Sequence, residues 1–193
     1  MNTVKQRCIK ACMVVSLIVS PLGSSADDFV AAEKKVLALA KAAISLRSVR
    51  GEDNQTPAVA ALFRDALLDG GWSKENVEIV PLDDTASFIA TWAGSDPSLG
   101  PIVISAHMDV VEAKREDWER DPFRPIVENG YLYGRGASDT KFDAAQALIA
   151  LIALRRQGFT PRRTIVVAFS GDEETTMHSS KVIADRLSHS TLV

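Results

Sequence analysis

The chain has 193 residues, of which 46% are hydrophobic and 24% charged, with a formal net charge of -3. This length predicts one domain or slightly more, and the composition argues against intrinsic disorder. The small negative charge gives no electrostatic reason to expect nucleic acid as a partner.

The first 26 residues have the layout of a secretory signal peptide. A basic start is followed by an apolar run over residues 11–22 and then by small residues that end at Ala26. This order predicts cleavage after Ala26 and an exported protein, either periplasmic or secreted. The alternative is an uncleaved membrane anchor, although the run is short for a bilayer span. Both cysteines lie in this segment, so the mature chain, residues 27–193, would have neither a disulfide nor a thiol ligand.

The spacing of apolar residues predicts helices and short strands in alternation. In chain order, we expect a helix from Val36 to Leu46, a helix from Thr56 to Gly70, strands over 77–80, 87–92 and 101–105, a helix over 144–152, a strand over 164–169 and a final helix around Val182. The runs over 102–104 and 164–169 are continuously apolar, which is typical of strands buried on both faces.

Strands that alternate with helices predict an α/β fold, namely a three-layer sandwich with a mostly parallel central sheet. In such sheets, ligands bind at the carboxyl ends of the strands. Three segments that carry acidic residues or histidine leave predicted strands or turns there, and they are the candidates for chemistry.

The first segment carries His107 and Asp109, directly after the strand over 101–105. Residues two apart in an extended chain point the same way. His107 could therefore offer a ring nitrogen to a metal while a nearby carboxylate fixes its tautomer. By itself, however, an ordinary buried or surface histidine is the more common explanation of such a triplet.

The other two segments carry only acids. Asp139 follows a turn with two glycines, where its alternative role is to cap the next helix. Glu173 and Glu174 follow the strand over 164–169, where the alternative is a solvated acidic turn. Taken together, one imidazole and several carboxylates at strand ends suit Zn²⁺ or a similar divalent ion.

Five motifs in this order resemble those of the di-zinc aminoacylase and carboxypeptidase family of metallopeptidases. They are HMDVV at 107–111, DW at 117–118, DPF at 121–123, ENGYLYGRGASDTK at 128–141 and SGDEET at 170–175. The family includes acetylornithine deacetylase, succinyl-diaminopimelate desuccinylase and glutamate carboxypeptidases. The resemblance covers residues 29–193. It implies a zinc-dependent hydrolase of amide bonds in small peptides or N-acyl amino acids.

The resemblance also implies three metal ligands. His107 would ligate one zinc, Asp139 would bridge two, and Glu174 would ligate the second. The peptide between Asp139 and Thr140 would be cis. A complete site of the family holds two Zn²⁺ ions, and Co²⁺ or Mn²⁺ could occupy similar ligands.

Two catalytic roles follow from the same resemblance. Asp109 would orient the imidazole of His107, and Glu173 would be the general base that takes a proton from water and passes it to the leaving amine. Between them, two metals would lower the pKa of the attacking water and stabilise the developing oxyanion.

The chain departs from the family pattern in two ways. Phe142 stands where the family usually has glycine. A further carboxylate ligand, a second metal-binding histidine and the lid or dimerisation domain would all lie beyond Val193. We therefore expect the N-terminal part of a catalytic domain, truncated before its last strands, with little or no activity. A homodimer is expected only of a full-length form. No membrane span is expected after removal of the signal peptide. The alternative is an inactive remnant or a non-catalytic binding module that keeps the fold.

Overall fold

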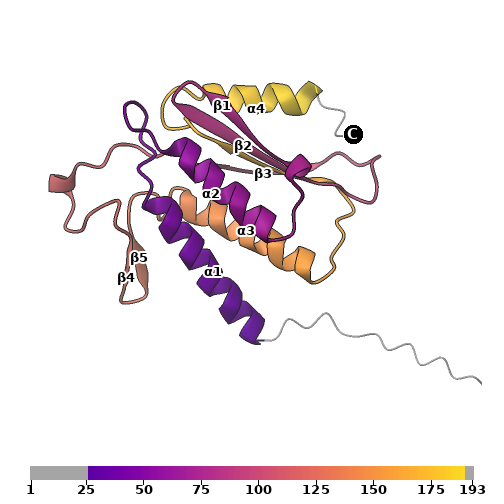
Figure 1. Ribbon diagram of the computed structural model, residues 1–193, viewed down its shortest axis with the longest axis horizontal. Coiled ribbons are helices and arrows are strands. Elements are labelled where there is room, and N and C mark those ends of the chain that lie inside the picture. Colours follow the sequence, from indigo (N-terminus) through magenta and orange to yellow (C-terminus); the bar gives the residue numbers. More distant parts are fainter. Residues whose placement is uncertain (1–25, 190–193) are drawn as a thin grey trace, which may run out of the picture.

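The computed structural model describes residues 26–189 (Figure 1). The predicted signal peptide, residues 1–26, lies outside the described residues except for Ala26, where the first helix begins. No helix within the described range is long and apolar enough to cross a bilayer.

Four strands form the central sheet in the order β1-β2-β6-β3. Their bounds are Val77–Leu82 for β1, Thr85–Trp92 for β2, Ile102–His107 for β3 and Ile165–Ser170 for β6. Helices α1 (Ala26–Ile44), α2 (Thr56–Asp69) and α3 (Lys141–Arg156) lie on one side of the sheet, and α4 (His178–His189) lies on the other (Figure 1). The α/β class and the three layers are therefore confirmed.

The sheet is mixed, which corrects the prediction of a mostly parallel sheet. β1 and β2 are joined by only Asp83 and Asp84, and β2 pairs antiparallel with both β1 and β6. A two-residue connection can join only antiparallel neighbours. Parallel pairing among the described strands is limited to β3 and β6, whose connection includes α3.

β3 also differs from its prediction as a strand buried on both faces. It lies at the edge of the described sheet, and Ile102 and Val103 are 49% and 46% exposed. β6, in contrast, is buried along its whole length between β2 and β3. An apolar run predicts a strand, but the number of neighbours decides how much of the strand is buried.

The core lies between the sheet and helices α1, α2 and α3. Phe63 of α2 packs edge-on against Phe88 of β2 and Phe169 of β6, with ring centroids 6.3 and 5.9 Å away. On the other face, Ile183 of α4 joins a smaller apolar cluster on β2 and β6. These contacts hold the helices against both faces of the sheet.

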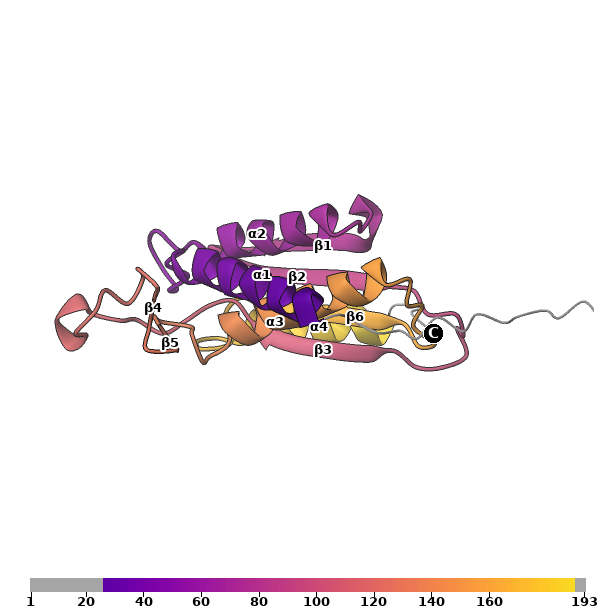
Figure 2. The same ribbon diagram turned by 90° about the horizontal axis from the view of Figure 1, so that it is seen from below.

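Two short strands and two 3-10 helices complete the fold. They are β4 (Ile126–Glu128), β5 (Tyr131–Tyr133), η1 (Lys74–Asn76) and η2 (Arg115–Asp117). β4 and β5 pair as a separate antiparallel hairpin. Figure 2 shows that β3 ends on the side of the molecule from which this hairpin projects. The carboxyl end of β3 is therefore the place to look for the predicted site.

Candidate metal centre

His107 is the last residue of β3, and its side chain is buried. Its Nδ1 lies 3.0 Å from the backbone carbonyl oxygen of Asp109, and its Nε2 lies 2.9 Å from Oδ1 of Asp139. One ring nitrogen is thus held by the chain that follows β3. The other points at a carboxylate from a segment 32 residues away.

Asp139 lies just before α3, with its side chain 64% exposed. The Asp139–Thr140 peptide is cis, as the resemblance implies. The Thr140 hydroxyl donates to the carbonyl oxygen of His107 at 3.0 Å and accepts from its N–H at 3.1 Å. Thr140, not Asp139, occupies the N-cap position of α3, and no side-chain capping bond forms there. The alternative that Asp139 caps the helix is therefore wrong.

Asp109 joins the histidine to the glutamate pair. Its side chain is buried, and Oδ1 lies 3.5 Å from Nδ1 of His107. The same carboxylate accepts backbone N–H bonds from Glu173 at 3.1 Å and Glu174 at 3.0 Å. The sequence predicted the contact with His107 but not the bonds to the glutamate backbone. Asp109 therefore fixes two parts of the site at once.

The three predicted ligands come together at one point. One side-chain ligand atom from each of His107, Asp139 and Glu174 lies within 4.8 Å of the other two. Oε2 of Glu173 lies 3.9 Å from Nε2 of His107, and this side chain is 42% exposed. A nitrogen donor with carboxylate oxygens at this spacing is a donor set that fits Zn²⁺. The roles of the individual residues remain predictions.

Comparison with known proteins agrees with this geometry. Residues 103–192 match the family model described as Peptidase family M20/M25/M40. Aminoacylase-1 of Sus scrofa is 37% identical over 136 residues, which are 70% of this chain and 33% of the relative. The matched residues 103–192 contain all five candidate site residues, so the chain resembles this family at its candidate site. A second relative, N-fatty-acyl-amino acid synthase/hydrolase PM20D1 of Mus musculus, is 44% identical over 88 residues, or 46% of this chain and 18% of the relative.

Solved structures agree on the fold. The di-peptidase Dug1p of Saccharomyces cerevisiae superposes with a TM-score of 0.68 at 20% identity, over 81% of this chain and 36% of that one. Human carnosine dipeptidase 1 gives a TM-score of 0.63 at 25% identity, over 82% and 36%. The chain thus spans about a third or less of the length of these relatives.

The charges of the candidate site act strongly on each other. Burial favours the neutral imidazole of His107, but its contacts with Asp109 and Asp139 outweigh this and raise its pKa to about 9. Burial, together with the neighbouring carboxylates, raises the pKa of Glu174 above its usual range, although His107 opposes the shift. Without a cation, the site therefore holds a proton on His107 at neutral pH, and a metal must displace it.

Sequence reasoning missed the role of Asp172, which lies beside the glutamate pair. Its carboxylate is fully buried and accepts hydrogen bonds from the backbone N–H groups of His178 and Ser179 and from the hydroxyls of Thr176 and Ser179. Acceptors of this kind satisfy the first N–H groups of a helix. Asp172 thus fixes the turn between β6 and α4. The signal in the sequence was an Asp shortly before a predicted helix, a place where Asp often accepts the first N–H groups of the helix.

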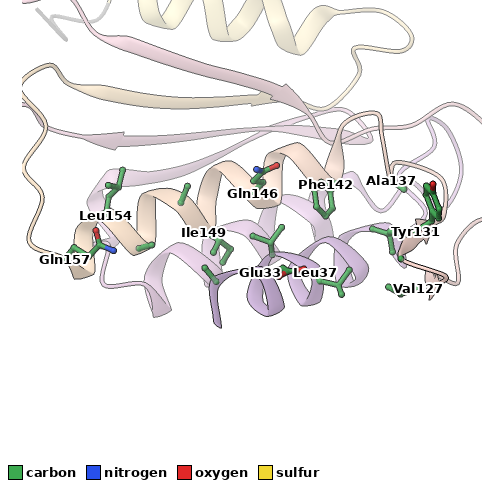
Figure 3. A pocket seen from close by; sticks show the side chains of 16 residues that line it. Glu33, Leu37, Val127, Tyr131, Ala137, Phe142, Gln146, Ile149, Leu154 and Gln157 are labelled. Atoms are coloured by element: carbon green, nitrogen blue, oxygen red, sulfur yellow. The ribbon is translucent and has the colours of Figure 1, made fainter. Parts of the chain in front are cut away.

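A large cavity among the described residues lies elsewhere. It has a volume of about 1280 Å³ and runs between α1, α3 and the β4–β5 hairpin (Figure 3). Its lining is mainly apolar and includes Phe142, the residue that departs from the family pattern. The five candidate site residues are absent from the lining. A large apolar pocket is often the default candidate site, but here the candidate chemistry lies at the end of the sheet.

Proposed function

We propose that this chain carries the metal-binding part of a zinc-dependent hydrolase that cleaves amide bonds in peptides or N-acyl amino acids. The observation that carries the proposal is the grouping of His107, Asp139 and Glu174 around one point. The names of the relatives support the substrate class, since they include an aminoacylase and two dipeptidases.

In this proposal, Nε2 of His107 and carboxylate oxygens of Asp139 and Glu174 are the ligands. A divalent cation held there would supply a Lewis acid that polarises the scissile carbonyl and makes water more acidic. Zn²⁺ is preferred because the donors mix nitrogen with oxygen, with Co²⁺ and Mn²⁺ as alternatives. Asp109 orients His107 at Nδ1, the ring nitrogen that is not a proposed ligand, through both its backbone carbonyl and its carboxylate.

Glu173 is the proposed general base. Its carboxylate lies beside His107, and it is exposed enough to meet water and a substrate. Its backbone is held by Asp109, so the side chain starts from a fixed position. It would take a proton from water and return that proton to the leaving amine.

The experiment is an amide-hydrolysis assay of the purified chain with Zn²⁺, using N-acetyl amino acids and dipeptides and detecting the released amine by mass spectrometry. We expect slow, zinc-dependent release. Glu173→Gln should lower the rate by about 100-fold or more, to the metal-free background, because general-base catalysis contributes that much. The variant should still bind zinc, since Glu173 is not a proposed ligand. Zinc binding without any release above background would instead favour a non-catalytic binding module.

Three further proposals rest on the sequence. We infer export from residues 1–26, and a homodimer only for a full-length form. We also infer that this chain is one part of a larger catalytic unit, which is why the expected turnover is slow. The number of ligand residues supports this inference. The described residues bring one histidine and two carboxylates together, whereas a complete site would hold two zinc ions and need more ligands.

A further inference from the structure

Lys141, the first residue of α3, has a fully buried side chain. Its Nζ donates hydrogen bonds to the backbone carbonyl oxygens of Ala43 at 2.9 Å and Leu46 at 2.8 Å. Ala43 lies in the last turn of α1 and Leu46 lies just beyond it. Carbonyl groups at a helix end have no partner within the helix, and a cation there is favourable. The ammonium group of Lys141 therefore connects the start of α3 to the end of α1.

The stem of Lys141 also packs against the loop that leads to Asp139. A Cβ atom added at Gly136 would lie 3.0 Å from Cδ of Lys141 and 3.2 Å from its Cγ. Gly136 has a φ of +95°, which glycine adopts without strain. The loop backbone thus lies against the lysine stem, and a side chain at Gly136 would require that stem to move by a few tenths of an ångström.

Asp139 lies between these two attachments. On one side, Gly136 rests on the Lys141 stem, and on the other, Thr140 forms two hydrogen bonds with the backbone of His107. Lys141 follows Thr140 directly. Movement of Lys141 relative to α1 would therefore carry Asp139 relative to the ring of His107.

Helix packing alone does not require a charge at this position. Burying an ammonium group costs free energy unless the group is hydrogen-bonded, and an apolar side chain carries no such cost. A methionine is as long as lysine without its amine and could fill the same space. What methionine lacks is the pair of directed hydrogen bonds that sets the position of the α3 start against α1.

We propose that Lys141 is a positioning residue of the metal centre, which holds the Asp139 segment against α1 and so sets the separation between the carboxylate of Asp139 and the imidazole of His107. This inference rests on the proposed function, because it presupposes that the two groups bind one cation.

The test compares the purified wild-type chain with Lys141→Met and Lys141→Arg, and with Lys181→Met as the matched control on the exposed side of α4. The measurements are the Zn²⁺ dissociation constant by calorimetry, the visible absorption spectrum of bound Co²⁺, and urea unfolding. Lys141→Met should weaken zinc binding by about 10- to 100-fold, the loss typical when a group that supports a ligand is removed. Its Co²⁺ spectrum should change, and its unfolding midpoint should fall moderately, because the carbonyl oxygens of Ala43 and Leu46 lose their donor. Lys141→Arg should recover part of the affinity, and Lys181→Met should match the wild type.

The outcomes separate this inference from the proposed function. If the wild-type chain binds no zinc, the proposed function fails and takes this inference with it. If the wild type binds zinc and Lys141→Met binds it equally well with the same Co²⁺ spectrum, only the role of Lys141 is overturned. If Lys141→Met does not fold, Lys141→Arg decides. A folded Lys141→Arg that binds zinc more weakly than the wild type, with a changed Co²⁺ spectrum, supports the role of Lys141. A folded Lys141→Arg with the affinity and the spectrum of the wild type contradicts it.

Discussion

Replacing Asp109 with Ala is expected to weaken zinc binding by about 10- to 100-fold. The buried carboxylate faces Nδ1 of His107 and holds the backbone N–H groups of Glu173 and Glu174. Its loss frees the imidazole to rotate and the glutamate turn to move. It also leaves two N–H groups without their acceptor, which should lower the free energy of unfolding by about 1–3 kcal/mol for each that stays buried.

The test measures zinc affinity by calorimetry and stability by urea unfolding on the same preparations. Asp109→Asn should fall between the wild type and Asp109→Ala, because an amide keeps one oxygen acceptor. The control is Asp69→Ala, since Asp69 is an exposed acid at the end of α2. A folded Asp109→Ala chain with the zinc affinity of the wild type would show that Asp109 does not orient the site.

The largest effect on stability is expected for Phe63→Ala, which should lower the free energy of unfolding by about 3–5 kcal/mol. The Phe63 side chain is fully buried and joins α2 to the sheet through its edge-on contacts with Phe88 and Phe169. Truncation leaves a cavity among rigid aromatic neighbours that cannot collapse to fill it.

Urea unfolding followed by circular dichroism measures this change. Phe159→Ala is the matched control, because Phe159 is 44% exposed although it contacts Trp92 edge-on. It should cost about 1 kcal/mol or less. Loss of any cooperative transition in Phe63→Ala would agree with the expected result, since domains are marginally stable. A loss as small as that of Phe159→Ala would instead mean that this cluster does not organise the core.

The sequence predicted the strands of the central sheet and the cores of the four helices, because apolar spacing reports which face of an element is buried. It missed the β4–β5 hairpin and the part of α1 before Val36. It could not report the direction of strand pairing, so the sheet emerged as mixed. It also could not report the neighbours of β3, where Ile102 and Val103 are half-exposed despite an apolar run. Both properties depend on contacts between segments that are distant in sequence.

The candidate site shows the same division. Histidine and acids at strand ends were enough to select His107, Asp139 and Glu174, which the structure brings together. The groups that hold them were hidden, because Lys141 binds backbone atoms and Asp172 binds backbone N–H groups as well as hydroxyls. Backbone carbonyls and N–H groups are the same in every residue, so sequence letters do not reveal these partners.

Calorimetric titration of the purified chain with Zn²⁺ tests the central claim most directly. Because the pKa of His107 is raised to about 9 without a cation, binding at neutral pH should release about one proton. For the same reason, the affinity should rise by about tenfold per pH unit between about pH 6 and about pH 8. Single replacement of His107, Asp139 or Glu174 by Ala should each weaken binding by about 100-fold or more, and His107→Ala should remove the pH dependence. The account is contradicted if the folded wild-type chain takes up no zinc, or if it binds zinc equally well after these replacements.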